Sequence, residues 1–290
     1  MLLFLLEMIV RCVFMTNVSE LKEFATKIRI ETIKEIATLG VGHIGGALSI
    51  CDVLAVLYGG VMNVDPKNPC DENRDWLVVS KGHSGPALYA TLALKGFFPM
   101  ETLKTLNKPD TILPSHCDRH APGVDMTTGS LGQGSSLAMG IALGNKMSGK
   151  SNYTYLLLGD GECNEGQVWE AVMFANSKKL NNLIAFVDDN KQQLDGFTKD
   201  ISNMEDFAAK FSAFGWYAQS IDGHDVEAIS NAIKNAKENK NGPSVIVLNT
   251  IKAKGFKKWE GVQGNHNFNI TMEDALQFEK DILADEQAGK

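Results

Sequence analysis

Two polar segments of the sequence carry the residue types that hold divalent cations in proteins. The first is a Gly-Asp-Gly turn around Asp160, and it directly follows the apolar run 153–158. The second ends at Asn190 and follows the next apolar run, 183–187. Carboxylate and amide oxygens are the ligands that Mg²⁺ and Ca²⁺ prefer, and such an ion keeps positions open for phosphate oxygens and water. Together the two segments predict a cation site that also binds a diphosphate.

The prediction of a cation site depends on where these two residues lie relative to the predicted strands. A Gly-Asp-Gly sequence alone is also an ordinary turn. In a parallel sheet, however, ligands bind beyond the carboxyl ends of the strands, and two adjacent strands would present Asp160 and Asn190 side by side there. The glycines on either side of Asp160 also allow a ligand to approach the backbone closely.

Short apolar runs and helical stretches alternate along the chain. The runs, each a predicted buried strand, are 76–79, 153–158, 183–187, 216–221 and 245–248. The predicted helices are 21–40, 50–57, 135–146, 166–177, 225–238 and 272–285. This alternation predicts an α/β fold with a mostly parallel sheet and helices on both faces. Since no internal repeat or low-complexity linker interrupts it, we expect a single domain over residues 16–290.

The net charge and the cysteine pattern argue against several classes of binding partner and metal site. The 290 residues include 28 Lys and Arg against 35 Asp and Glu, a formal net charge of −7, without a run of basic residues. Nucleic acid and anionic membranes are therefore poor partners. The five cysteines, an odd number without Cys-x-x-Cys spacing, predict reduced thiols and a cytoplasmic location, not a disulfide framework or a zinc site.

The first fifteen residues differ from the rest. Residues 1–15 are apolar but contain Glu7 and Arg11, so they fall short of the roughly 20 apolar residues that a membrane-spanning helix needs. They also lack the basic start and the small cleavage-site residues of a signal peptide. We interpret them as a translated leader before a start at Met15. The alternative is a helix that is buried against a partner chain.

One nucleotide-binding motif is matched by its letters only. Residues 144–151 read GNKMSGKS and satisfy the phosphate-loop pattern G-x-x-x-x-G-K-S. That loop must follow a strand and open a helix, whereas here a predicted helix precedes Gly144 and a predicted strand follows Ser151. We therefore interpret Lys150 as a solvated loop residue and reject a nucleotide site.

Three further segments point to a family. They are GHIGGALS at 42–49, SKGHSGPALYA at 80–90 and TTGSLGQG at 127–134. Together with the Asp160 and Asn190 pair, which resembles the thiamine diphosphate motif, they resemble the transketolase family, in order, from about Lys27 to His266. The resemblance implies the thiamine diphosphate-binding fold of that family. It also implies the cofactors thiamine diphosphate and Mg²⁺, with Ca²⁺ or Mn²⁺ as substitutes for the metal.

The resemblance assigns residues to the cofactor site. It implies that the metal is held by Asp160, Asn190 and the backbone carbonyl of Gln192. Gly161 and the helix that begins near Glu165 would offer backbone N–H groups to the diphosphate. Glu165 also matches an acidic position near a subunit boundary. The alternative for Glu165 is an acidic residue at a helix start, stabilised there by the helix dipole.

Four histidines match the substrate channel of transketolases, where they bind sugar hydroxyls and move protons: His43, His83, His116 and His266. Histidine suits this work because it titrates near working pH. The resemblance implies that His83, Gly129 and Leu131 also contact the cofactor, the last two at its aminopyrimidine ring. Outside this set, we interpret His224, in Asp-Gly-His-Asp, as a turn or packing residue.

Full-length transketolases are more than twice as long and carry a pyrimidine-binding domain after the diphosphate-binding one. The resemblance therefore implies the amino-terminal subunit of a split transketolase, which is inactive alone and works as a heterotetramer with a carboxyl-terminal subunit. It would transfer a two-carbon ketol unit between a ketose phosphate and an aldose phosphate, as in the pentose phosphate pathway. The alternatives are a split relative that acts on a branched or sulfonated sugar, a non-catalytic cofactor-binding subunit, and a fragment of a longer protein.

Overall fold

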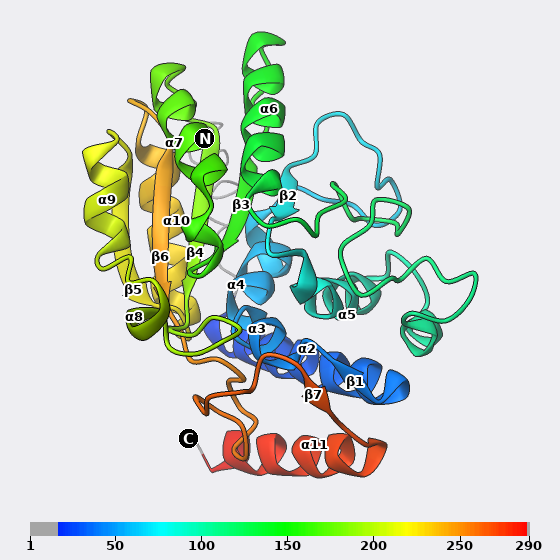
Figure 1. The fold of residues 1–290 in the computed structure, drawn as a ribbon. Coiled ribbons are helices and arrows are strands. Elements are labelled where there is room, and N and C mark those ends of the chain that lie inside the picture. Colours follow the sequence, from blue (N-terminus) through cyan, green and yellow to red (C-terminus); the bar gives the residue numbers. More distant parts are fainter. Residues whose placement is uncertain (1–16, 289–290) are drawn as a thin grey trace.

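A five-stranded parallel sheet forms the centre of the protein (Figure 1). The computed structural model describes residues 17–288. The strands lie in the order β2-β3-β4-β6-β5, and every neighbouring pair is parallel. Their bounds are β2 (Trp76–Val79), β3 (Thr154–Gly159), β4 (Leu183–Asp189), β5 (Tyr217–Asp222) and β6 (Ser244–Asn249). The predicted α/β class with a parallel sheet is confirmed, and all five predicted runs form strands.

The strands in the middle of the sheet are apolar because both of their faces are buried. Along β3, successive side chains point to opposite faces, so that Tyr155 and Leu157 join one hydrophobic cluster while Leu156 and Leu158 join another. Every position of β3 and β4 is buried, whereas no position of the edge strand β5 is buried. The continuous apolar runs in the sequence thus reflect strands that are covered on both sides.

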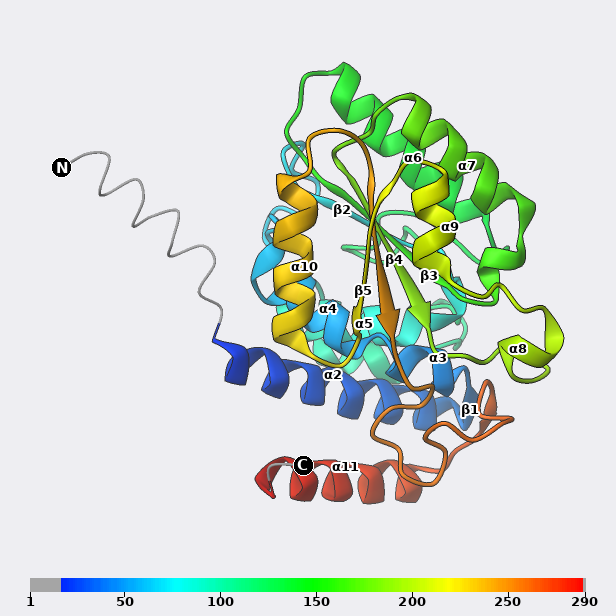
Figure 2. The same ribbon diagram turned by 90° about the vertical axis from the view of Figure 1, so that its left-hand side faces the viewer.

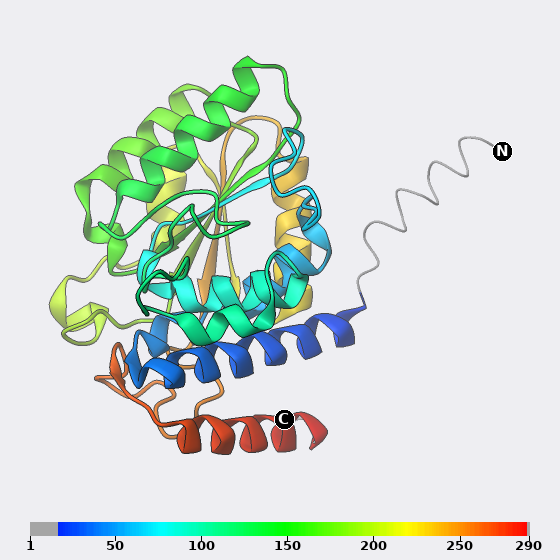
Figure 3. The ribbon, with the colours of Figure 1, turned by 90° about the vertical axis from the view of Figure 1, so that its right-hand side faces the viewer.

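Helices cover both faces of the sheet (Figure 2). The cluster that contains Tyr155 is shared with α2 (Val18–Leu39), α4 (Cys51–Val56), α5 (Gly85–Lys95) and α10 (Val226–Glu238). The other cluster is shared with α6 (Gln133–Met147), α7 (Gly166–Ser177) and α9 (Phe207–Ala213). The last helix, α11 (Met272–Gln287), packs on α2, so that α2 lies between α5 and α11 (Figure 3).

Local sequence explains where several helices begin and end. The side chain of Asn17 accepts a hydrogen bond from Ser19 N at 3.0 Å and caps α2. The same helix ends at Gly40, whose φ of 91° favours glycine. The Asp225 side chain caps α10, and a capping box at Thr271 starts α11. These caps fix the helices whose loops carry the residues discussed below.

The loops that leave the carboxyl ends of the strands open at one end of the sheet. Gly159 and Asp188 are paired across β3 and β4, so that Asp160 and Asn190 leave neighbouring strands side by side, as the sequence predicts. The short strands β1 (Val41–Gly42) and β7 (Phe268–Asn269) form a separate antiparallel pair. The remaining short elements are α3 (Ile44–Leu48), η1 (Leu57–Val61), η2 (Gly82–Ser84), η3 (Met100–Thr105), η4 (Glu162–Asn164) and α8 (Thr198–Ile201).

Some elements have no counterpart in the sequence prediction. α5 is the longest of them, and most of its residues are buried. A helix that is apolar on all sides lacks the one-sided periodicity by which amphipathic helices are found. α8 has four residues, and β1 and β7 have two residues each, too few for any periodicity to register.

The surroundings of residues 144–151 agree with the rejection of a phosphate loop. Gly144 lies inside α6, and the chain enters β3 only at Thr154, so that a helix precedes the strand. The Lys150 ammonium lies 3.3 Å from Glu72 Oε2 at the surface. The amides of a helix start therefore do not face this lysine.

Two sequence predictions concern the ends of the chain and the membrane. No helix within residues 17–288 is long and apolar enough to cross a membrane. Residues 1–15 lie outside the described residues. The leader and its alternative, a segment buried against a partner, both stay predictions.

Candidate active site

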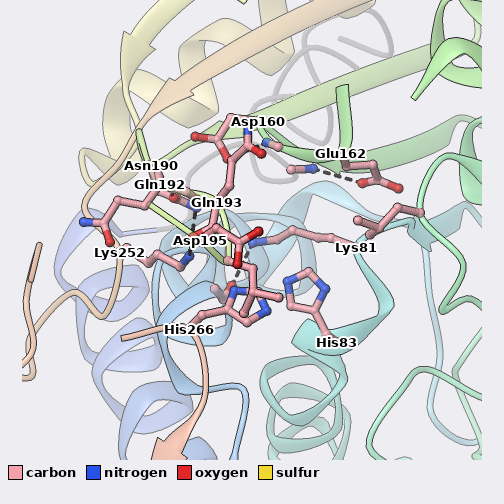
Figure 4. Close-up of a pocket in the computed structure, with 15 residues that line it drawn as sticks. Lys81, His83, Asp160, Glu162, Asn190, Gln192, Gln193, Asp195, Lys252 and His266 are labelled. Atoms are coloured by element: carbon pink, nitrogen blue, oxygen red, sulfur yellow. Dashed lines mark hydrogen bonds between the residues drawn. The ribbon is translucent and has the colours of Figure 1, made fainter. Parts of the chain in front are cut away.

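A cavity of about 220 Å³ opens beyond the carboxyl ends of β3 and β4 (Figure 4). Its wall includes seven residues that the sequence analysis selected: His83, Leu131, Asp160, Gly161, Asn190, Gln192 and His266. In Figure 4, His83 and His266 lie toward one end of the cavity and Asp160 toward the other. The wall also contains Lys81, Glu162 and Lys252, which the sequence analysis did not select. The cavity thus joins the predicted metal ligands to two of the four predicted channel histidines, while His43 and His116 lie outside its wall.

Asp160 directly follows β3, and only 2% of it is exposed. Gly161 N–H donates to its Oδ1 at 2.8 Å, and the Thr198 hydroxyl donates to its Oδ2 at 3.2 Å. Burial, and after it the negative charge of Asp188, raise the pKa of Asp160 to about 7. A buried carboxylate beside a second carboxylate is stabilised by a nearby cation.

Asn190 and Gln192 are buried in the loop after β4. The Asn190 amide donates to Asp188 Oδ2 at 2.9 Å, and its Oδ1 accepts from Gln192 N–H at 3.1 Å. Between them, Lys191 has a φ of 66°, which turns the backbone. The Gln192 carbonyl accepts from the Lys252 ammonium at 3.2 Å. The loop is therefore held from both sides.

These groups fit a hard divalent cation. They are a carboxylate, an amide and a backbone carbonyl, an oxygen set that Mg²⁺ takes together with phosphate oxygens and water. Asp160 lies beside a second negative charge, and the Gln192 carbonyl already accepts from an ammonium group. Positive charge is thus favourable at both oxygens. Within residues 17–288, no three His, Cys, Asp or Glu side chains form a metal site, so a cation here would depend on the amide and carbonyl oxygens as well.

A buried ion pair behind Asn190 escaped the sequence analysis. Lys81 Nζ lies 2.5 Å from Asp188 Oδ2, and both side chains are almost fully buried. Lys81 also donates to Gly46 O at 2.8 Å, and the Ser49 hydroxyl donates to Asp188 Oδ2 at 2.7 Å. Burial acts to raise the pKa of Asp188, but the Lys81 ammonium and these hydrogen bonds hold it below its ordinary value. The carboxylate that accepts from Asn190 is therefore charged and fixed in place.

Lys252 is a second cation at the cavity that the sequence analysis missed. It comes from the loop after β6, and its ammonium donates to Gln192 O at 3.2 Å and to Gln193 O at 3.1 Å. Burial lowers the pKa of Lys252 to about 8, although the charge of Asp160 acts in the opposite direction. The available signal was the rule that ligands bind after strand ends, which also applies to the loop after β6.

Glu162 is the third missed residue, although it directly follows the Gly-Asp-Gly turn. It is 2% exposed. Its Oε1 accepts from the Ser80 hydroxyl at 2.5 Å and from Gly132 N–H at 2.8 Å, and its Oε2 accepts from Gly159 N–H at 3.0 Å. Burial raises the pKa of Glu162 despite these hydrogen bonds. Glu162 therefore ties the loop after β2 and the start of α6 to the end of β3.

The other three predicted histidines surround His43. The ring centroid of His43 lies 5.5 Å from that of His83, 5.6 Å from that of His116 and 5.3 Å from that of His266. The rings of His83 and His266 are 5.0 Å apart. These residues come from four separate segments, at the start of α3, in η2, after η3 and before β7. The fold thus gathers histidines that are far apart in the sequence.

Three of these histidines are held in the neutral form. Burial lowers the pKa of His43, and the neighbouring His116 adds to the effect. Burial and the Lys81 charge lower the pKa of His83 well below its ordinary 6.5, and burial and the Lys252 charge lower that of His266 to about 3. A neutral imidazole offers one nitrogen as a hydrogen-bond acceptor, so the cluster can bind hydroxyl groups of a ligand.

The other predicted contacts lie at different places relative to the cavity. Leu131 lines it, and Gly129 lies beside His116, where an added Cβ would be 3.6 Å from the His116 ring. The Gly161 N–H donates to Asp160. Glu165 is exposed, directly precedes α7 without a capping hydrogen bond from its side chain, and lies outside the cavity wall.

The parallel sheet, with Asp160 and Asn190 at adjacent strand ends and histidines at the other end of the cavity, agrees with the class that a family profile gives, a thiamine diphosphate-binding domain. The sequence profile described as "Transketolase, thiamine diphosphate binding domain" matches residues 21–286. The chain belongs to the transketolase family.

Similar proteins of about the same length are named as transketolase subunits. The 6-deoxy-6-sulfo-D-fructose transketolase subunit SqwG of Clostridium sp. (strain MSTE9) is 55% identical over 88% of this chain and 93% of its own length. An apulose-4-phosphate transketolase subunit from Phocaeicola vulgatus is 38% identical over 78% of this chain and 80% of its own.

Longer transketolases match the same region. Transketolase of Homo sapiens is 35% identical over 93% of this chain, which corresponds to 43% of the human protein. The structure of transketolase from Leishmania mexicana superposes with a TM-score of 0.85 and 29% identity, over 90% of this chain and 41% of that one. The Campylobacter jejuni enzyme gives a TM-score of 0.83 and 30% identity, over 94% and 48%. The chain therefore spans less than half the length of these transketolases.

Proposed function

We propose that the chain is the amino-terminal subunit of a two-subunit transketolase that transfers a two-carbon ketol unit from a ketose to an aldose. The observation that supports it most is that Asp160, Asn190 and Gln192 share one cavity with the channel histidines His83 and His266. The family membership and the relatives that are named as subunits support it as well.

The cofactor site is proposed at the Asp160 end of the cavity. Asp160, Asn190 and the Gln192 carbonyl would hold a divalent cation, with Mg²⁺ as the proposed metal. The cation and the Lys252 ammonium would together offset the charge of a diphosphate. Thiamine diphosphate supplies the carbanion chemistry when it is bound.

The histidine cluster is proposed to handle the sugar. His43, His83 and His266 carry lowered pKa values, so each is neutral at working pH and offers a nitrogen lone pair to a ketose hydroxyl group, from which it would take the proton. His116 adjoins His43 and would bind a second hydroxyl. The same groups return the proton when the acceptor aldehyde has taken up the ketol unit.

A carboxyl-terminal partner subunit completes the proposal. This chain corresponds to 43% of human transketolase but to 93% of SqwG, which is named as a subunit. We propose that the partner supplies the other half of the cofactor site, that the two form a heterotetramer, and that this chain is inactive alone. A cytoplasmic location belongs to the same proposal and is supported by the free thiols of Cys51, Cys70, Cys117 and Cys163.

A sulfonated sugar is the second candidate for the donor. It is favoured by the 55% identity to a subunit named for 6-deoxy-6-sulfo-D-fructose, over the 38% identity to a subunit named for apulose 4-phosphate. Donors with a phosphate and with a sulfonate headgroup are therefore compared in the experiment below.

Reconstitution tests the proposal. The purified chain is mixed with the candidate partner subunit, thiamine diphosphate and Mg²⁺. The mixture is assayed with fructose 6-phosphate, 6-deoxy-6-sulfo-D-fructose or apulose 4-phosphate as the donor and an aldose phosphate as the acceptor. We expect ketol transfer only in the complete mixture, at least about 10²-fold slower with His266→Ala, as is typical for loss of a general acid–base group. His120→Ala, an exposed histidine paired with Asp118, is the matched control and leaves the rate unchanged. A complete mixture that turns over none of these donors, yet binds the cofactor, would favour a non-catalytic subunit.

A further inference from the structure

His224 lies in the turn between β5 and α10, at the end of the sheet where the cavity opens. Its backbone N–H donates to Asp222 Oδ1 at 2.8 Å, so it is a turn residue, as the sequence predicts. Its ring also makes two hydrogen bonds, one through each nitrogen. Nδ1 lies 2.8 Å from Asp52 Oδ2, and Nε2 lies 2.8 Å from the backbone nitrogen of Ile251.

These two contacts fix the tautomer of His224. A backbone N–H only donates, so Nε2 must offer its lone pair to Ile251. The ring proton is then on Nδ1 and is donated to Asp52. Asp52 is held in turn by Arg29, which donates to both of its carboxylate oxygens, at 3.1 Å for Oδ1, and both side chains are buried. His224 is thus an anchored hydrogen-bond acceptor aimed at Ile251.

Ile251 lies between two residues that touch the cofactor region. The Thr250 hydroxyl donates to Asp188 Oδ1 at 2.5 Å, and Asp188 accepts from Asn190. The Lys252 ammonium donates to the carbonyls of Gln192 and Gln193. Ile251 is 40% exposed, so apolar packing holds this residue weakly. Backbone hydrogen bonds hold its neighbours, from Thr250 N–H to Asp189 O at 3.3 Å and from Gly261 N–H to Lys252 O at 2.8 Å. The Ile251 N–H itself is held by His224, so this bond orders the middle of the segment 250–252.

We propose that His224 is a positioning residue, which orders the segment 250–252 and so places the Lys252 ammonium at the diphosphate end of the cavity. The consequence for the cofactor rests on the function proposed above. The ordering of the segment does not, because it follows from contacts within this chain.

Two substitutions of His224 test its two ring hydrogen bonds separately. In asparagine the amide nitrogen lies where Nδ1 of histidine lies, so His224→Asn keeps the contact with Asp52 and loses the acceptor for Ile251. In glutamine the amide oxygen reaches the position of Nε2, so His224→Gln keeps the acceptor for Ile251 and loses the contact with Asp52. His120→Asn is the matched control, because His120 is exposed and its ring is paired with Asp118.

Amide hydrogen exchange of the full chain without cofactor is the first measurement. We expect peptides that cover residues 249–253 to exchange about 3- to 10-fold faster in His224→Asn, which corresponds to the loss of one hydrogen bond. They stay near the wild-type rate in His224→Gln and in His120→Asn. Unchanged exchange in His224→Asn, or equally fast exchange in His224→Gln, would overturn the ordering role.

The second measurement is the affinity for thiamine diphosphate and Mg²⁺, in the full chain alone and mixed with its partner subunit. We expect a Kd about 3- to 10-fold higher for His224→Asn, with largely restored affinity in His224→Gln. Faster exchange without a change in Kd would overturn the link to the cofactor. A wild-type assembly that does not bind the cofactor would contradict the proposed function, while the exchange data would still decide the role of His224.

Discussion

The Lys81 ammonium and the Asp188 carboxylate form a buried ion pair, 2.5 Å apart, directly behind the amide of Asn190. The pair joins the loop after β2 to the end of β4, two strands that are separated by β3 in the sheet. It therefore holds the frame in which Asn190 is presented to the cavity.

Removing the cation should destabilise the fold because the carboxylate would stay buried without its charge partner. We expect Lys81→Met to lower the free energy of unfolding by about 3–5 kcal/mol, the usual cost of breaking a buried pair from one side. Lys150→Met is the control, since Lys150 pairs with Glu72 at the surface, and it should cost less than about 1 kcal/mol. Urea denaturation of both variants measures the difference. An equal loss of unfolding free energy in the two variants would show that the buried ion pair stabilises the fold no more than the surface pair does.

Asp160 should lower the stability of the cofactor-free chain when it is ionised, although we expect the cofactor to need it for binding. Its pKa of about 7 lies above the ordinary 3.8, so the stability that it contributes in the protonated form is lost as the pH rises through about 7. We expect Asp160→Asn to raise the free energy of unfolding at pH 8 in the absence of ligands, by up to about 4 kcal/mol, and to leave it nearly unchanged at pH 4. Urea denaturation at the two pH values measures this.

The same variant should lose the cofactor. Thiamine diphosphate and Mg²⁺ raise the melting temperature of a chain that binds them, by an amount that depends on their concentration relative to Kd. We expect this rise in the wild-type assembly and not in Asp160→Asn. An undiminished rise in the variant would remove Asp160 from the metal site.

The sequence predicted the parts of this site that depend on position along one strand. Asp160 and Asn190 each follow an apolar run, and the ends of neighbouring parallel strands necessarily meet. The partners Lys81, Glu162 and Lys252 could not be derived in this way, because each acts through a contact between loops of different strands. The fold-level pattern says which loops share an end of the sheet but not which side chains in them touch.

The buried histidines should make the fold sensitive to acid. The folded-state pKa values of His83 and His266 lie below the ordinary 6.5, so the stability that these residues contribute is present above pH 6.5 and is lost as the pH falls below it. Each adds a slope of up to about 1.4 kcal/mol per pH unit. We expect His266→Asn to flatten the dependence of unfolding free energy on pH between 6.5 and about 5, compared with His120→Asn, whose ring is exposed. Parallel slopes in the two variants would contradict a neutral His266.

Glu35 on α2, which lies away from the cavity, should affect the pH dependence of stability in the direction opposite to that of the buried histidines. It is 2% exposed, and neither of its carboxylate oxygens has a hydrogen-bond partner among residues 17–288. Burial, and after it the charge of Glu31, raise the pKa of Glu35 well above its ordinary 4.5. The folded state therefore binds more protons than the unfolded state, and stability falls as the pH rises above about 4.5.

Replacing this carboxyl by an apolar side chain of similar volume should remove that loss. We expect Glu35→Met to raise the free energy of unfolding at pH 8 by about 1–3 kcal/mol, the cost of an unpaired buried polar group, and to change it little at about pH 4.5. Glu23→Met is the matched control on the same helix, because Glu23 is exposed and pairs with Lys27 at the surface. Urea denaturation at the two pH values measures both variants. A gain of the same size at both pH values would mean that packing, and not ionisation, limits stability at this position.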